Sequence, residues 1–235
     1  MLSFINFEDG AKDSVTGNDW TLGSSTTIEE GGKVGNCILT KPNGSTSSTK
    51  NNGNNYGENA ENVGLYNGSI ACWYNANGGI SGGTGSHILK LDLGFNRIGL
   101  YIYIFGNGSS GYSFRATINR AYSSSGYKSE LDLVSLGITS SEFVHLALTW
   151  TEDRVVKMYV NGEYKQTWNV TEEIWNKMVA KDTDAFGIDH GSETAGGGEG
   201  FVDEVGFWDR ALADSEIKSL YNAGINGITY PFNGV

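Results

Sequence analysis

The chain of 235 residues has only two cysteines and two prolines. Cys37 and Cys72 are too few for a disulfide framework, and we expect two buried free thiols, although the sequence leaves open whether they pair. The longest apolar run, Ile98 to Phe105, is far shorter than the ~20 residues that a membrane helix needs. No Cys/His cluster indicates zinc, because the three histidines are widely scattered.

Basic residues are also scarce. Sixteen lysines and arginines face 27 aspartates and glutamates, which gives a formal net charge of −11. An acidic chain without a basic stripe is excluded as a nucleic-acid binder. The acidic excess favours solubility, and it offers oxygen ligands for Ca²⁺.

The first residues, Met1 to Ile5, lack the basic start and long apolar stretch of a secretory leader. Two expectations follow. Either a leader was removed, or the protein reaches its site without one, as virion proteins do when they leave the cell by lysis.

Glycine is abundant, at 34 residues, and aromatic residues make up 12% of the chain against 18% charged residues. This composition is typical of many short strands joined by tight turns. We therefore predict one all-β domain over residues 1–235, a two-sheet antiparallel β-sandwich. The expected strands are Leu2–Glu8, Gly35–Lys41, Gly68–Asn75, Ser86–Leu93, Arg97–Phe105, Tyr112–Asn119, Tyr127–Leu133, Glu142–Trp150, Arg154–Val160, Glu163–Trp168, Ala185–Asp189 and Phe201–Trp208.

Local signals add a hairpin and two short helices. Asn161 and Gly162 tolerate the positive φ that a type I′ turn needs. We expect helices near Thr171–Met178 and Asp214–Asn222, with Gly224 as a left-handed stop after the second.

Three polar or glycine-rich segments are predicted to be surface loops: Lys41–Val63, Asn77–Gly85 and Gly191–Gly200. The first is either a binding loop or a floppy insertion. Aromatic rings at loops or helix edges offer flat apolar faces for sugars. The candidates for glycan binding are Tyr56, Tyr122 and Trp175.

Catalysis is weakly indicated. Glu130 and Asp132 supply two carboxylates on one face of a strand, as glycoside hydrolases require. A third carboxylate at the usual spacing is missing, because Val134 and Ser135 stand there. The alternative is that both lie on the solvent face of an alternating strand.

The end of the chain carries a recognisable pattern. The segment 200–222 contains the strand Phe201-Val202-Asp203-Glu204-Val205, then Arg210-Ala211-Leu212, then Ser215-Glu216-Ile217 and Leu220-Tyr221. It resembles the closing segment of laminin G-like, concanavalin A-like jelly-roll domains. Weaker similarities occur at Phe7-Glu8-Asp9-Gly10, Ser69-Ile70-Ala71-Cys72-Trp73 and Val144–Gly162. The family usually has Ser or Thr as the cap of the last helix, where this chain has Ala213.

The resemblance implies a concanavalin A-like jelly roll and one structural Ca²⁺. Its ligands would be Asp13, Asn18 and Asp203, carried over from the opening loop and the closing strand. The alternative is an Asx turn at Asp13 and local capping or pairing by Asp203.

We therefore expect a non-catalytic recognition and attachment protein at a virion surface or outside the cell, with no membrane insertion. It would decorate a capsid or belong to a tail, and its partners would be cell-surface glycans, capsid or tail proteins. The alternatives are a glycoside hydrolase or lyase of the same fold, and a secreted bacterial adhesin or carbohydrate-binding module. The sequence leaves a homo-oligomer open.

Overall fold

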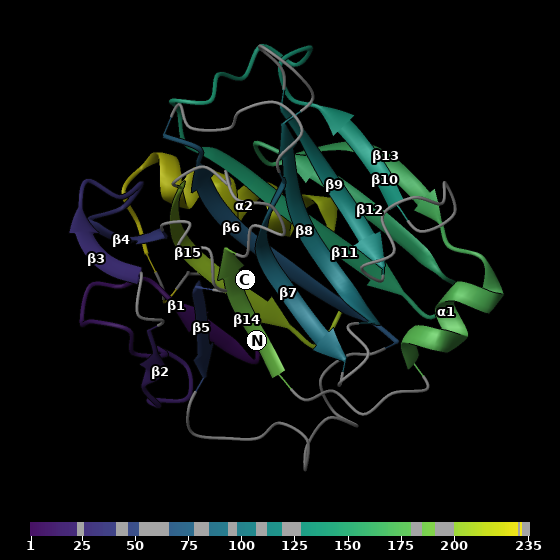
Figure 1. Ribbon diagram of the computed structural model, residues 1–235, viewed down its shortest axis with the longest axis horizontal. Helices are drawn as coiled ribbons and strands as arrows, with labels where there is room; N and C mark the ends of the chain where they lie inside the picture. The colour runs from purple at the N-terminus through teal and green to yellow at the C-terminus, as the bar shows by residue number, and fades with distance from the viewer. Residues whose placement is uncertain are drawn as a thin grey trace.

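The computed structural model describes residues 1–22, 26–40, 47–51, 66–77, 85–93, 98–106, 112–118, 128–179, 185–190, 200–229 and 231. Within these residues the strands pair antiparallel into two sheets, accompanied by two short helices (Figure 1). The sequence-based prediction of an antiparallel concanavalin A-like β-sandwich is confirmed.

The first sheet carries the C-terminal helix α2 (Asp214–Ile225) on its outer face, and we call it the helix-side sheet. Its strand order is β13 (Glu163–Asn169), β12 (Val155–Val160), β11 (Val144–Thr151), β6 (Gly68–Asn75), β15 (Gly200–Trp208), β4 (Asn36–Thr40) and β3 (Thr26–Glu30). The short strand β1 (Ser3–Ile5) also pairs with β15, so the beginning and the end of the chain meet in this sheet.

The second sheet has the order β10 (Lys128–Asp132), β9 (Tyr112–Ile118), β8 (Ile98–Gly106), β7 (Gly85–Leu93), β14 (Ala185–His190), β5 (Ser47–Asn51) and β2 (Trp20–Thr21). Helix α1 (Glu172–Val179) contacts β8 and lies at one end of the sandwich (Figure 1).

The central strands of the helix-side sheet are buried on both faces. In β11, Leu146 and Leu148 belong to the main core between the sheets, whereas Ala147 packs in a smaller core against α2. β6 shows the same division, since Ile70 lies in the main core and Ala71 lies under the helix. Successive side chains of a strand point to opposite faces, so a covered outer face makes the whole strand apolar.

The predicted hairpin is present between β12 and β13. Asn161 and Gly162 have φ values of 52° and 72°, as a type I′ turn requires. Asn161 also braces the neighbouring strand, because its side-chain oxygen accepts a hydrogen bond of 3.0 Å from the backbone N–H of His145.

One side of the sandwich is closed by a glutamine. Gln166 in β13 donates from Nε2 to Ser129 Oγ at 2.7 Å and to the carbonyl of Glu130 at 3.1 Å. These contacts join the edge strands β13 and β10 of the two sheets, which lie side by side in Figure 1.

Several boundaries differ from the sequence-based expectations. The predicted loop Lys41–Val63 contains β5, and neither β2 nor β3 was predicted. Gly224 does not stop the last helix: it lies buried inside α2, and the positive φ of 67° falls at Gly227. A side chain at position 224 would collide with the indole of Trp73, so packing explains this glycine.

Both cysteines are buried and free, as expected. Within the described part of the chain, no helix has the length and apolar character needed to cross a membrane.

Candidate functional site

Asp13, the first predicted calcium ligand, is completely buried in the turn that follows β1. Its Oδ1 accepts hydrogen bonds from the backbone N–H groups of Phe4, Val15 and Thr16, at 3.2, 2.9 and 3.2 Å. Its Oδ2 accepts one from the hydroxyl of Ser3. A carboxylate has about four acceptor positions, so the chain's own donors occupy the carboxylate of Asp13.

Asp203, the second predicted ligand, is also completely buried. Its two oxygens accept hydrogen bonds from the N–H groups of Val34 at 2.9 Å and Glu204 at 2.8 Å. Burial raises the pKa of Asp203 to about 7, with a further rise from the Glu8 charge, although hydrogen bonds from backbone N–H groups lower it.

Asn18 closes the turn that begins at Asp13, because its carbonyl accepts the N–H of Asp13 at 2.8 Å. Asp203 instead closes the turn at residues 31–35 from the other side. Among the residues that the structure describes, no group of three or more His, Cys, Asp or Glu side chains could hold a metal ion. Asp13 forms the Asx turn of the alternative, whereas Asp203 accepts one hydrogen bond from its neighbour Glu204 and one from the distant Val34. Calcium therefore stays a prediction from the resemblance alone.

The structure describes only one of the three residues predicted to bind glycans. Tyr56 and Tyr122 lie outside the described residues. The prediction for Trp175 is wrong, because only 3% of this residue is exposed and it packs in the main core with Ile174 of the same helix. A ring buried between the sheets has no face for a sugar.

The carboxylates considered for catalysis have structural partners. Glu130 pairs across β10 and β9 with Arg115, at 2.8 Å from Nε and 3.1 Å from Nη2, and Lys128 lies 3.6 Å away. Burial raises the pKa of Glu130, but hydrogen bonds from Arg115 and Ser113 and the charges of Arg115 and Lys128 outweigh it and lower the pKa overall. An ionised, paired glutamate cannot serve as the general acid of a glycoside hydrolase, which needs a raised pKa.

Asp132 does not complete a catalytic pair either. Its Oδ1 accepts the N–H groups of Val134 at 3.0 Å and Ser135 at 3.4 Å, which forms a turn after β10. The two carboxylates thus have separate structural roles in the described part of the chain.

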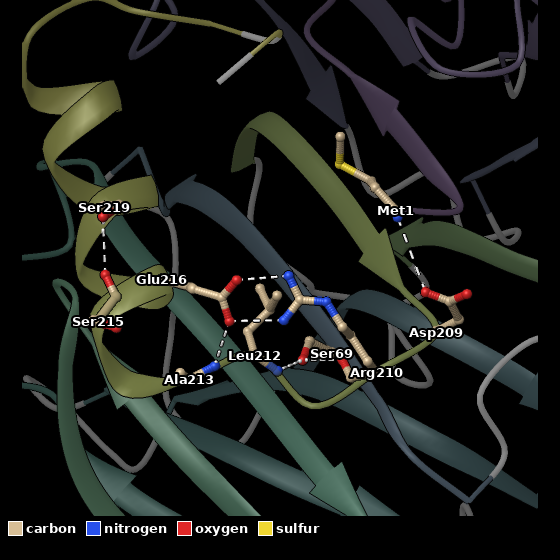
Figure 2. Close-up of polar contacts among 9 residues, drawn as sticks. All are labelled: Met1, Ser69, Asp209, Arg210, Leu212, Ala213, Ser215, Glu216 and Ser219. Atoms are coloured by element: carbon tan, nitrogen blue, oxygen red, sulfur yellow. Dashed lines mark hydrogen bonds and ion pairs between the residues drawn. The ribbon is translucent and has the colours of Figure 1, made fainter. Parts of the chain in front are cut away.

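The segment that carries the family resemblance fixes α2 to the sheet (Figure 2). Ser69 of β6 donates from its hydroxyl to the carbonyl of Arg210 at 2.9 Å and accepts the N–H of Leu212 at 2.8 Å. Glu216 accepts the N–H of Ala213 at 2.8 Å and binds the guanidinium of Arg210 at 2.6 and 2.7 Å. The hydrogen bonds from Arg210 are the largest cause that lowers the pKa of Glu216 to about 2.

This contact set, which we call the α2 clamp (Ser69, Arg210, Leu212, Ala213 and Glu216), replaces half of the usual capping box. Ala213 has no side-chain oxygen to accept from the first turn, but Glu216 still reaches back to the N–H of Ala213. In Figure 2 the amino group of Met1 also points to Asp209, 4.0 Å away.

Two buried polar residues under α2 were missed by the sequence reasoning. His145 is 2% exposed and Glu204 is 6% exposed. Burial lowers the pKa of His145 to about 3. Burial, followed by the charge of Asp203, raises the pKa of Glu204 to about 9. One signal was available: two adjacent acidic residues in the otherwise apolar strand Phe201–Trp208 need a bulge, since strict alternation would place one of them in the main core.

The fold and the α2 clamp together define a jelly-roll domain of the concanavalin A type. The chain belongs to the Concanavalin A-like lectin/glucanases superfamily, whose family model matches residues 46–218. No curated protein matches the chain by sequence.

Solved structures of similar fold are binding domains of larger proteins. A botulinum neurotoxin serotype D/C binding domain has a TM-score of 0.69 at 15% identity and matches 95% of this chain and 51% of its own. The binding domain of Paraclostridial Mosquitocidal Protein 1 has a TM-score of 0.63 at 17% identity, over 94% and 51% of the two chains. A related neurotoxin domain, with a TM-score of 0.66 and 14% identity over 95% and 51%, was solved in complex with rat synaptotagmin II. The chain spans about half the length of these structures, and such low identity establishes the fold alone.

Proposed function

We propose that this chain is a non-catalytic recognition domain that attaches to a partner outside the cell or at the surface of a particle. The observation that carries the proposal is the ion pair between Glu130 and Arg115, which occupies the carboxylate best suited to hydrolysis. Similar structures are a receptor binding domain and a botulinum neurotoxin binding domain, which supports the same class of function. A further neurotoxin binding domain was solved in complex with rat synaptotagmin II.

The more specific proposal is attachment through one rim of the sandwich, formed by the predicted loops Lys41–Val63, Asn77–Gly85 and Gly191–Gly200. The partner would be a cell-surface glycan, or a capsid or tail protein if the chain belongs to a virion. An adhesin or carbohydrate-binding module outside the cell would use the same rim. The sequence of Lys41–Val63, rich in Asn, Ser and Gly, suits hydroxyl groups and protein backbone alike.

The purified protein should be tested on a glycan array and in pull-downs with candidate capsid and tail proteins. We expect saturable binding that falls at least tenfold in Tyr56→Ala or Tyr122→Ala. The matched control is Tyr164→Ala, which removes a 47% exposed tyrosine from β13. Equal loss in all three variants, or no binding to any probe, would count against the rim.

The enzyme alternative is tested by reducing-sugar release and unsaturated-product formation across a polysaccharide panel. We expect no turnover above background. Robust turnover that Glu130→Gln abolishes would replace the proposed function with hydrolysis or elimination.

A further inference from the structure

A small cavity lies beneath α2, on the outer face of the helix-side sheet. Its apolar wall includes Ala71, Trp73, Trp208 and Leu220, and its polar wall is formed by His145 and Glu204. The space available to the centre of a water-sized sphere is about 10 Å³. That volume matches one water molecule, since a cavity needs about 10–15 Å³ by this measure to hold one.

Two polar atoms in this wall are buried without a hydrogen-bond partner: Nδ1 of His145 and Oε1 of Glu204. Both residues are more than nine-tenths buried. Buried nitrogen and oxygen atoms in native proteins nearly always have a protein or water partner, because an unpaired one loses its hydration without replacement. A cavity lined by both of these residues therefore requires an explanation.

The backbone of β15 places the Glu204 side chain there. The pairing of β15 with β6 shifts register between Asp203 and Gly206, and Glu204 has a φ of 51°, which non-glycine residues rarely adopt. Because of the bulge, two consecutive side chains have separate contacts. Asp203 binds the turn at residues 31–35, and Glu204 lines the cavity. A strained residue that persists in a well-packed strand points to a specific role.

We propose that this cavity is a binding site for a single water molecule, which bridges Glu204 Oε1 and His145 Nδ1 and so links β15 to β11 beneath α2. Water both donates and accepts hydrogen bonds, so it can join these atoms whichever of them carries a proton. The strands β15 and β11 flank β6 and do not pair with each other. The water would therefore supply a polar link across three strands, inside an otherwise apolar layer.

A crystal structure of the complete chain at about 1.5 Å resolution tests the site directly. We expect one ordered solvent peak within about 2.6–3.2 Å of both Nδ1 of His145 and Oε1 of Glu204, the range of ordinary hydrogen bonds. An empty cavity, or a direct hydrogen bond between the two side chains, would overturn the proposal.

Solution NMR gives a second, independent measurement on the wild-type protein. A long-lived water should show a cross-peak to the methyl groups of Ala71 and Leu220, which line the cavity. The methyl groups of Ile70 and Leu146 in the main core are the internal control, because they lie between the sheets and should show none. Absence of the signal at Ala71 and Leu220 would contradict the site even if every variant failed to fold.

Variants then assign the partners. Glu204→Gln keeps an oxygen at the same position and should keep the water signal. His145→Phe keeps a ring against Trp73 and Tyr221 but removes the nitrogen, and the signal should be lost. An unchanged signal in His145→Phe would show that the histidine is not a ligand of the water.

Discussion

At the residue scale, two separate structural requirements, a positive φ and a close contact with α2, explain the glycine at position 162. Its φ of 72° belongs to the type I′ turn, and a side chain there would come within 2.6 Å of Tyr221 Cβ in α2. The sequence predicted the first requirement from the Asn-Gly pair. It could not predict the second, because the hairpin and α2 are far apart in the chain.

Replacing Gly162 with alanine, and comparing it with a glycine that has only the positive φ, should separate these two requirements. We expect Gly162→Ala to lower the free energy of unfolding by about 2 kcal/mol or more, since it combines an unfavourable φ with a clash. Gly137→Ala is the matched control, because Gly137 has a φ of 76° and nothing within 4 Å of the added carbon. Urea denaturation of both variants gives the measurement, and equal losses would show that the contact with α2 costs nothing.

The unusual cap Ala213 gives a prediction in the opposite direction. Its backbone is extended, with φ −71° and ψ 157°, as an N-cap should be. Ala213→Ser should therefore raise the free energy of unfolding by about 1 kcal/mol, because the hydroxyl can accept an N–H of the first turn. Ala211→Ser, the same change outside the cap position, should have little effect in the same thermal or urea melts. A gain of equal size in the two variants would contradict the capping account.

His145 gives a pH-dependent prediction. Its pKa falls from about 6.5 in the unfolded chain to about 3 in the folded protein. The contribution of the buried, neutral His145 to the free energy of unfolding is therefore complete above pH 6.5. It decreases as the pH falls, because the unfolded chain then binds a proton that the folded protein does not. The stability advantage of wild type over His145→Gln should shrink by up to about 1.4 kcal/mol per pH unit below 6.5. Urea melts at pH 7 and pH 5 measure this, and a constant difference would contradict it.

At the element scale, most strands were predicted within one or two residues, although β1 ends at Ile5 and not at Glu8, and β2, β3 and β5 were missed. β6 and β11 were recognised because both faces are buried and their sequences are apolar. β3 reads Thr-Thr-Ile-Glu-Glu and β5 reads Ser-Ser-Thr-Lys-Asn, so neither shows the period of an apolar face. Such strands form because they pair with neighbouring strands, and a local sequence pattern carries no information about those neighbours.

The candidate site was predicted less well than the fold, for a related reason. Asp13 and Asp203 were singled out as calcium ligands, which stays a prediction, and their hydrogen-bond partners Ser3 and Val34 became visible only in three dimensions. Trp175 follows two glutamates at the start of a helix, which suggested an exposed edge, yet the apolar side of α1 faces the core.

The α2 clamp can be tested at this scale with two serines. Ser69→Ala should lower the free energy of unfolding by about 2 kcal/mol, because it removes two hydrogen bonds and leaves the buried N–H of Leu212 without its partner. Ser219→Ala is the control: its hydroxyl donates to the carbonyl of Ser215 at 2.9 Å on the exposed side of α2. Both serines are drawn in Figure 2. Similar, small losses in chemical denaturation would show that the clamp is not a principal support of the helix.

At the scale of the whole molecule, the two buried aspartates hold turns of the N-terminal segment to the strands β1 and β15. Asp13 holds the opening turn to β1, and Asp203 holds the turn at residues 31–35 to β15. Both turns pack near the sheet in which β1 and β15 join the two ends of the chain.

The metal question follows from this arrangement. If calcium bound as the family resemblance implies, excess chelator would lower the melting temperature and elemental analysis would find about one calcium ion per chain. The hydrogen bonds of Asp13 lead us to expect an unchanged melting temperature. A clear fall that added Ca²⁺ reverses would restore the calcium assignment and show that these turns rearrange on binding.

The link formed by Gln166 has a consequence for self-association. A sheet edge with free backbone groups can recruit a strand from another molecule, which is the usual route to fibres and exchanged dimers. Where β13 and β10 are tied to each other, an incoming strand would have to displace the amide of Gln166 from Ser129 and Glu130. Copies of this chain should therefore resist polymerisation by strand addition at the β13 and β10 margin, and removal of the Gln166 amide should weaken that resistance.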